Sequence, residues 1–154
     1  MADLAQTHLK AGDKAPDFTG LDQEGKSHKL SDYASDKLIL FFYPKDNTPG
    51  CTAEACNLRD NYGTLKKQGY KLLGVSADNA KKHQNFIEKF DLPFPLLADV
   101  DLTIINSFGV WGRKKFMGRE YDGILRTTFV IENGKITKVI DNVKTKDHAA
   151  QILE

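Results

Sequence analysis

Cysteine is scarce in this chain, because only two of its 154 residues are cysteines. Two are too few for the disulfide scaffold of a small secreted protein. They stand at Cys51 and Cys56, and a bridge across so short a loop would stabilise a fold little. The pair therefore needs a chemical rather than a structural explanation.

The chain also lacks an excess of charge, since 22 Lys and Arg residues stand against 21 Asp and Glu residues. A net charge of +1 gives no electrostatic reason to expect nucleic acid or an anionic membrane as a partner. The basic run Arg113-Lys114-Lys115 is expected to lie on a solvated face for the same reason.

Long apolar runs, repeats and low-complexity tracts are absent as well. No run approaches the roughly 18 apolar residues that a membrane span requires. The first ten residues include Asp3, Gln6, His8 and Lys10, so they do not form a secretory signal. We therefore expect a cytoplasmic location. With roughly 150 residues per domain as a guide, residues 1–154 are expected to form a single domain.

Strand and helix patterns alternate along the chain, which favours an α/β fold. The apolar run at 38–42 predicts a strand buried on both faces of a sheet. Asn133-Gly134 is a strong signal for a hairpin turn. The elements expected after the first strand are a helix at 52–68, a strand at 70–75, a helix at 79–90, a short edge strand at 94–97, a helix at 102–108, hairpin strands at 125–131 and 135–140, and a helix at 145–153. This order predicts a mixed central sheet with helices on both faces.

Cys51 lies at the first junction between a predicted strand and a predicted helix. Ligand sites of such sheets lie where strand ends meet helix starts. A thiol in the first turn of a helix faces unpaired backbone N–H groups and the positive end of the helix dipole, which favour the thiolate. The alternative is that Thr48 caps the helix, Pro49 fills its first turn and Cys51 is a small buried hydrophobe.

The second cysteine argues against that alternative. On an ideal helix, positions five apart have Cα atoms about 8.7 Å from each other and point about 140° apart, whereas a disulfide needs Cα atoms within roughly 7 Å. A Cys51–Cys56 bond would therefore require local unwinding of the helix, which suits a redox switch better than a structural disulfide. Zinc or another metal is not expected, because the four histidines are scattered, at His8, His28, His83 and His148.

The run Pro44-x-x-x-Thr48-x-x-Cys51 resembles the signature of peroxiredoxins. The longer stretch 43–56 is similar to the Q type, also called the bacterioferritin comigratory protein subfamily. Further similar stretches lie at 12–18, 74–78, 94–99, 116–119 and 126–131, while the first seven residues lie outside the resemblance. The resemblance implies a thioredoxin-like fold and thiol-dependent reduction of hydrogen peroxide and organic hydroperoxides, with no cofactor.

The resemblance also implies roles for individual residues. Cys51 matches the peroxidatic cysteine and Cys56 the resolving cysteine, while Thr48, Pro44 and Arg126 match residues of the pocket. The expected cycle forms a sulfenic acid at the first cysteine, then an intramolecular disulfide after local helix unwinding. Thioredoxin or a similar dithiol reduces that disulfide, and the chain is expected to act as a monomer.

Each pocket residue has a chemical property that suits the expected reaction. Backbone N–H groups at Gly50 and Cys51 and the cation of Arg126 can stabilise the charge that moves onto the departing oxygen. The hydroxyl of Thr48 can donate and accept, and the rigid ring of Pro44 can shield the sulfur from water.

Several alternatives remain open from the residues themselves. Without the resemblance, Arg126 would be read as an ordinary charge at a sheet edge. Glu54 is either a surface acid favoured by the helix dipole or a residue that orients Arg126. Trp111 and Phe116 could lie in the core or at a pocket rim. The whole protein could instead be a non-catalytic redox sensor or a thiol-disulfide oxidoreductase.

Overall fold

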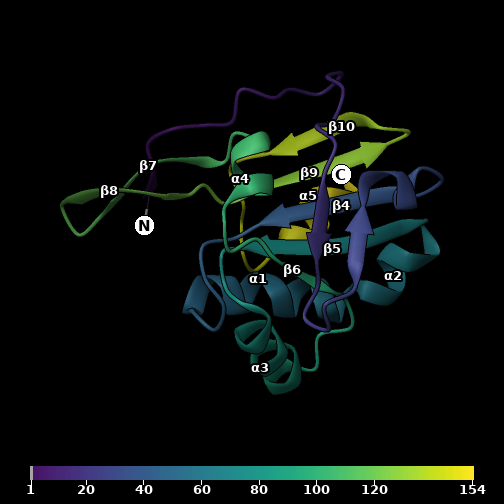
Figure 1. Cartoon of the computed structure of the whole chain (residues 1–154), viewed down its shortest axis with the longest axis horizontal. Coiled ribbons are helices and arrows are strands. Elements are labelled where there is room, and N and C mark those ends of the chain that lie inside the picture. Colours follow the sequence, from purple (N-terminus) through teal and green to yellow (C-terminus); the bar gives the residue numbers. More distant parts are fainter. Residues whose placement is uncertain (1) are drawn as a thin grey trace.

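The computed structural model describes residues 2–154 and is built around a five-stranded mixed sheet (Figure 1). The strand order is β10-β9-β4-β5-β6. The strands span Lys37–Phe42 (β4), Tyr70–Ser76 (β5), Leu96–Ala98 (β6), Thr127–Glu132 (β9) and Lys135–Ile140 (β10). β4, β5 and β6 run parallel, whereas β9 is antiparallel to both β4 and β10. The predicted mixed sheet is confirmed.

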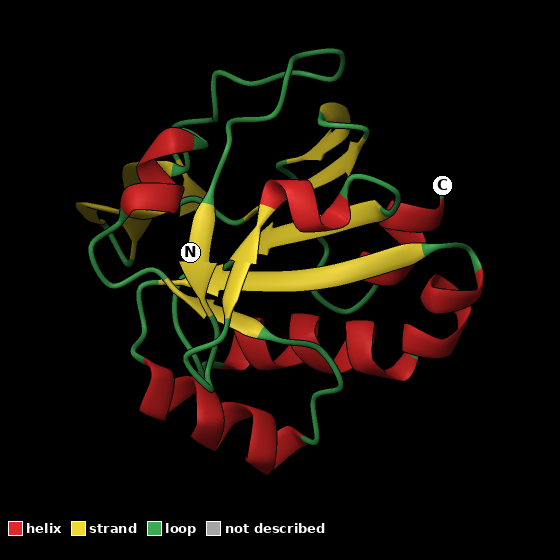
Figure 2. Cartoon of the chain, turned by 45° about the vertical axis from the view of Figure 1, so that its right-hand side comes forward, coloured by secondary structure: helices red, strands yellow, loops and turns green. Residues whose placement is uncertain are grey.

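Helices cover both faces of this sheet, as predicted (Figure 2). One face packs against α1 (Pro49–Asp60), α2 (Tyr62–Lys67), α3 (Ala80–Phe90) and α5 (His148–Leu153). The other face packs against α4 (Thr103–Ser107) and the 3-10 helix η1 (Leu30–Tyr33). β4 supplies both cores, because Leu40 and Phe42 point to one side while Ile39 and Phe41 point to the other.

Two helix boundaries differ from the sequence prediction. The helix expected at 52–68 begins earlier, at Pro49, and is divided into α1 and α2 at Asn61. The side-chain Nδ2 of Asn61 donates to the carbonyl of Asn57 at 2.8 Å, so an Asn that competes with the helical backbone marks the break. The last helix begins at His148 rather than at residue 145.

Helix α5 is tied to α1 by Asn57. Its Nδ2 donates to the carbonyl oxygen of Lys146, and its Oδ1 accepts from the backbone N–H of Ala149, each at 2.8 Å. These two bonds hold the C-terminal helix against the helix that carries both cysteines.

The predicted hairpin and edge strand are confirmed. Asn133 and Gly134 have φ values of 52° and 74° between β9 and β10, as a two-residue type I′ turn requires. β6 lies at the edge of the sheet, directly after Pro93 and Pro95, which could not donate within a central ladder.

The sequence prediction missed a second sheet, formed by β1 (Ala2–Asp3), β7 (Trp111–Phe116) and β8 (Arg119–Ile124). The β7–β8 hairpin projects from the body of the molecule (Figure 1), so most of its side chains are exposed and no apolar alternation marks it. Trp111 and Phe116 are exposed there rather than in the core. A further short pair, β2 (Thr19–Leu21) and β3 (Ser27–Lys29), was also missed.

The expectation that Lys114 is solvated is wrong. Its side chain is buried, and its Nζ lies 2.9 Å from Oδ1 of Asp3 and donates to the carbonyl of Ile124. Burial of this ammonium is possible because a carboxylate and a carbonyl replace its water. Among residues 2–154, no helix has both the length and the apolar character needed to cross a bilayer.

Candidate active site

Cys51 occupies the first turn of α1, as the sequence predicts. The helix begins at Pro49, and its first backbone hydrogen bond runs from the N–H of Thr52 to the carbonyl of Thr48 at 2.8 Å. The N–H groups of Gly50 and Cys51 precede that bond, so they have no acceptor within the helix. The Cys51 side chain is 2% exposed. A buried sulfur thus lies beside two backbone donors and the positive end of a helix dipole.

The pairing of β9 with β4 brings Arg126 to this sulfur. Thr127, the first residue of β9, lies opposite Phe42, the last residue of β4. Arg126 therefore reaches the strand end from which the cysteine loop departs, and its Nη2 lies 3.5 Å from Sγ of Cys51. This contact links residues that are 75 positions apart.

Gly50 leaves room for the arginine. A Cβ atom at this position would lie 3.0 Å from Nη2 of Arg126, closer than ordinary van der Waals contact. The guanidinium therefore packs directly over the backbone of the helix start, next to the sulfur. This close approach is the observed reason for a glycine at this place.

Glu54 holds the side chain of Arg126 in place through an ion pair. It is fully buried, so its interpretation as a surface acid is wrong, and its Oε1 accepts from Nη1 of Arg126 at 2.7 Å. Burial alone would lower the pKa of Arg126, but the negative charges of Glu54 and Cys51 outweigh it and raise that pKa. The guanidinium is therefore held as a permanent cation against the sulfur.

The second oxygen of Glu54 is less well satisfied. Within residues 2–154, Oε2 has no hydrogen-bond partner, although it is buried. It lies 3.5 Å from Nε2 of His148, the first residue of α5, which is also fully buried. In the sequence this histidine is one of four scattered along the chain, and no local pattern points to its contact with Glu54.

Thr48 and Pro44 lie on the loop that enters α1. Thr48 is the residue before the helix, with extended backbone angles (φ −103°, ψ 156°). Its hydroxyl donates to the carbonyl of Lys45 at 2.9 Å and does not cap the helix, contrary to the alternative considered from the sequence. Pro44 is half-buried directly after Tyr43 at the end of β4.

Both cysteines are free thiols in this structure. Cys56 lies in the same helix as Cys51 and is half-buried. Because both residues are helical, their separation is the one expected for positions five apart on a helix, which is too long for a disulfide.

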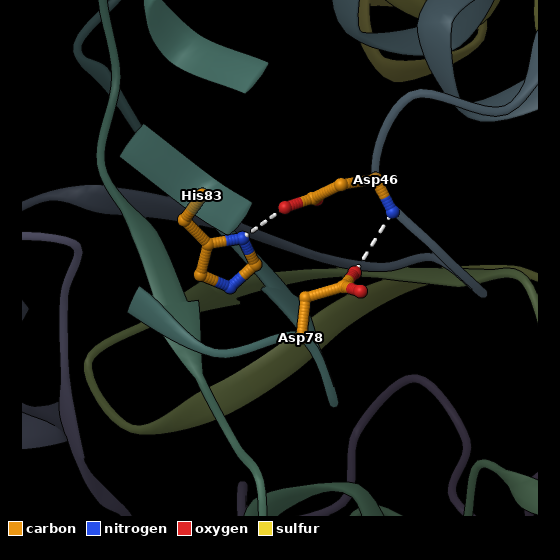
Figure 3. Close-up of side chains that lie close together, drawn as sticks. All are labelled: Asp46, Asp78 and His83. Carbon is orange, nitrogen blue, oxygen red and sulfur yellow. Dashed lines mark hydrogen bonds and ion pairs between the residues drawn. The ribbon is translucent and has the colours of Figure 1, made fainter. Parts of the chain in front are cut away.

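A second buried cluster includes Asp46, which belongs to the loop that enters α1 (Figure 3). Asp46, Asp78 and His83 place possible metal-ligating atoms within 4.8 Å of one another. Oδ2 of Asp46 lies 2.6 Å from Nδ1 of His83, and its Oδ1 accepts from the hydroxyl of Tyr43 at 2.6 Å. Burial and the negative charge of Asp46 raise the pKa of Tyr43 well above its usual value, so this hydroxyl keeps its proton.

Other atoms of this cluster also have partners. Oδ2 of Asp78 accepts from the backbone N–H of Asp46 at 2.8 Å and from Oγ of Ser76 at 2.7 Å. Nε2 of His83 lies 2.9 Å from the carbonyl of Leu97 and must therefore carry a proton. These bonds engage both side-chain oxygens of Asp46, both ring nitrogens of His83 and one oxygen of Asp78, so the cluster is a hydrogen-bonded tie between the loop, β5, α3 and β6. No local pattern indicates this cluster, since Asp46 and His83 are 37 positions apart.

A cavity of about 470 Å³ lies beside Arg126 on the side of the second sheet. Asp3, Gln6 and Lys114 line one part of it, and residues 141–143, which follow β10, line another. The N-terminal segment therefore borders the surroundings of the arginine, which the resemblance of the later residues did not indicate.

Comparison with known proteins gives a consistent result. The model of the AhpC/TSA family matches residues 11–139. Peroxiredoxin Bcp of Escherichia coli strain K12 is 49% identical over 146 residues, which cover 94% of each chain.

Solved structures agree. The crystal structure of peroxidoxin BcpB from Mycobacterium tuberculosis superposes with a TM-score of 0.83 at 37% identity and covers 95% of each chain. A structure of the Xanthomonas campestris bacterioferritin comigratory protein, described for its alkyl peroxide reduction activity, has a TM-score of 0.84 at 33% identity, covering 96% of this chain and 95% of that one. These neighbours confirm the thioredoxin-like fold.

Proposed function

Because the chain belongs to the AhpC/TSA family and is a thiol peroxidase of the Bcp peroxiredoxin type, we propose that Cys51 reacts with the peroxide and that Cys56 resolves the product. The observation that carries this proposal is the 3.5 Å contact between Sγ of Cys51 and Arg126 at the start of α1. The alternatives of a non-catalytic sensor or a disulfide oxidoreductase are not needed.

In the first step the thiolate of Cys51 attacks one oxygen of the hydroperoxide. An S–O bond forms, the O–O bond breaks, and the departing oxygen leaves as hydroxide or alkoxide and takes up a proton. Sulfur is oxidised to a sulfenic acid and the peroxide is reduced to water or an alcohol. Alkyl peroxide reduction by the Xanthomonas relative supports organic hydroperoxides as substrates beside hydrogen peroxide.

Fixed donors at the site support this step. Negative charge moves from sulfur onto the departing oxygen, and preorganised donors aimed at that path stabilise the transition state. The guanidinium of Arg126 contacts the sulfur, and the N–H groups of Gly50 and Cys51, which have no acceptor within the helix, belong to the same turn. Thr48 contributes a hydroxyl that is already fixed by Lys45, and half-buried Pro44 restricts water at the sulfur.

In the second step the thiolate of Cys56 attacks the sulfenic sulfur, and hydroxide leaves and is protonated to water. The product is an intramolecular disulfide. Because both cysteines are helical, this step requires the N-terminal turns of α1 to unwind. Cys56 itself is half-buried and does not have to leave a fully packed position, whereas Cys51 and Glu54 lose their buried surroundings when these turns unwind.

A dithiol then reduces the disulfide by exchange, returning two electrons and two protons to the cysteines. We propose thioredoxin or a similar protein as the donor, and a single-domain monomer over residues 1–154 as the working unit. Such donors keep thiols reduced in the cytoplasm, which supports a cytoplasmic location.

Peroxide-dependent oxidation of NADPH, coupled through thioredoxin and its reductase, tests this proposal. Cys51→Ser is expected to abolish turnover. Cys56→Ser is expected to keep the first oxidation step but to lose turnover with thioredoxin. Persisting turnover in Cys51→Ser would overturn the assignment of the reacting residue.

Mass spectrometry of the peroxide-treated wild-type chain provides the matching chemical readout. The expected product is a peptide that contains both Cys51 and Cys56 joined to each other, with the loss of two hydrogens. Retention of a sulfenic acid or a link between two chains would contradict the intramolecular step.

A further inference from the structure

His148 contacts the active-site network from the C-terminal helix, and the steps proposed above leave it without a role. Its ring is fully buried, and its Nε2 lies 3.5 Å from the oxygen of Glu54 that has no hydrogen-bond partner in the described chain. The other oxygen of Glu54 holds Arg126. Only Glu54 and Arg126 therefore separate this ring from the reacting sulfur.

The surroundings of the ring fix the proton on Nδ1. The side-chain amide of Gln151 donates from Nε2 to the carbonyl of Asn142 at 2.8 Å, and its Oε1 accepts from the backbone N–H of Lys144 at 2.9 Å. The orientation of this amide is therefore set by a carbonyl on one side and an N–H on the other. Because Oε1 is an acceptor, Nδ1 of His148, 2.9 Å away, must carry a proton.

Nε2 is consequently the ring atom at which protonation can change. When the ring is neutral, Nε2 presents a lone pair, accepts from the hydroxyl of Thr128 at 2.7 Å and gives Glu54 no donor. When the ring is cationic, Nε2 carries an N–H that lies 2.7 Å from the hydroxyl oxygen of Thr128 and 3.5 Å from Oε2 of Glu54, so the two oxygens share it. A buried carboxylate oxygen that gains a charged donor is stabilised more than one with a neutral donor.

A cationic ring balances the charges of the network when the thiolate is present. The thiolate of Cys51 and the carboxylate of Glu54 are two negative charges against the single positive charge of Arg126, in a largely buried place. A cationic His148 makes the set neutral, and buried net charge is costly. The ionisable groups around the ring are Glu54 from α1, with Arg126 behind it, Asp147 before it on the chain, and Lys138 of β10 at the far end of α5.

We propose that His148 is a positioning residue of the peroxidase. Its protonated Nε2 holds the free oxygen of Glu54, and Glu54 in turn holds the guanidinium of Arg126 against the sulfur of Cys51. This inference rests on the proposed function, because it assigns a reason for the placement of the arginine in that reaction.

Two substitutions separate the two ends of the ring. His148→Asn keeps a donor near the place of Nδ1, and so the bond to Gln151, but has no group that reaches Glu54. His148→Gln keeps a donor near the place of Nε2. We expect the second-order rate constant of Cys51 with hydrogen peroxide, measured by competition with a haem peroxidase, to fall about tenfold in the Asn variant. The Gln variant should recover most of that loss.

Recovery by the Gln variant is the readout that a merely structural role would not move, because only that variant restores a donor on the side of Glu54. Urea unfolding of both variants checks that the fold is retained. Equal rates for wild type and both variants, or an equal loss in both, would overturn the proposal.

The wild-type chain distinguishes this failure from failure of the proposed function. If the wild type does not consume hydrogen peroxide through Cys51, the proposed function fails. If it does, and the two variants behave as it does, only the role of His148 fails.

Discussion

Two buried histidines contact buried carboxylates in this molecule, and the two contacts differ in completeness. His83 and Asp46 are joined at 2.6 Å, and each of their polar side-chain atoms has a partner. His148 and Glu54 are separated by 3.5 Å, and one oxygen of Glu54 has no hydrogen bond among the described residues. The complete contact includes Asp46 of the loop that enters α1, whereas the incomplete one leads through Arg126 to the reacting sulfur.

The difference indicates that the contact of His83 with Asp46 serves the stability of the fold, whereas the contact of His148 with Glu54 serves the reaction. A buried polar network that is fully satisfied rigidifies the structure around it. A buried polar atom left without a partner costs free energy and is most easily understood where function requires it. We therefore expect substitutions at the first contact to change the free energy of unfolding, and substitutions at the second to change the reaction rate.

The largest expected effect is on stability at the complete contact. His83→Leu should lower the free energy of unfolding by roughly 3–5 kcal/mol, because it leaves the buried charge of Asp46 uncompensated. Urea denaturation measures this change, and the rate constant with peroxide should stay within about threefold of wild type.

The double variant Asp46→Ala with His83→Leu is the matched control for that prediction. Removal of both partners should cost less than the two single changes together, since no charge is left buried alone. If the losses of unfolding free energy in the two single variants add up to the loss in the double variant, the contact between Asp46 and His83 does not contribute to stability.

The next effect is on the rate at the active site. Arg126→Met removes a fixed donor at the sulfur and should lower the rate constant with hydrogen peroxide by roughly 10²–10³-fold. Arg126→Lys keeps the charge but loses the two-armed geometry that serves Glu54 and Cys51 together, so it should lie between wild type and the Met variant. A Met variant as fast as wild type would contradict the assigned role.

A smaller effect is expected from Gly50→Ala. The added Cβ would lie 3.0 Å from Nη2 of Arg126 and would displace the guanidinium by a few tenths of an ångström. A shift of that size should lower the rate constant several-fold, roughly three to ten times. Gly63→Ala in α2 is the control, because its Cβ would meet no atom within 4 Å, and it should leave the rate unchanged.

The smallest effect concerns a third histidine–carboxylate pair, His28 with Asp22, which is less buried than the other two. Burial alone would raise the pKa of Asp22, but hydrogen bonds from His28 and from the backbone N–H groups of Glu24 and Lys26 outweigh it and hold that pKa below its usual value. A lowered pKa in the folded state adds stability above the unfolded value, about 3.9, and this stability is lost as the pH falls through the folded value.

Asp22→Asn should therefore cost about 1 kcal/mol of unfolding free energy at neutral pH and progressively less below about pH 4. Urea unfolding of both chains across that range measures the difference. A difference that is the same at neutral and at acid pH would show that the carboxylate charge does not contribute.

The parts of the fold that the sequence predicted are those with local signals. The apolar run of β4, the turn at Asn133-Gly134 and the start of α1 near Cys51 each depend on a few neighbouring residues. The β7–β8 hairpin was missed because its strands are charged and exposed, and Lys114 was misplaced because its partner Asp3 is far away in the chain.

The same limit applies to the candidate site. Cys51 and Arg126 were found through a family signature, and their contact in the structure has the expected partners. The contacts of Asp46 with His83 and of Glu54 with His148 join residues on different elements, and no spacing in one sequence reveals which elements will meet. Burial of Glu54 could not be inferred either, since an acid in a first helical turn is ordinarily at the surface.

Asn57 sets a limit on how much of the molecule must lose order in each turnover. It directly follows Cys56, and its side chain is bonded at both ends to the segment around α5. In the proposed cycle, unwinding that begins at Pro49 reaches a fixed point immediately after the resolving cysteine. The loss of order is then confined to about two turns of one helix, so the enzyme could open its reactive end in every cycle while the sheet and the remaining helices stay folded.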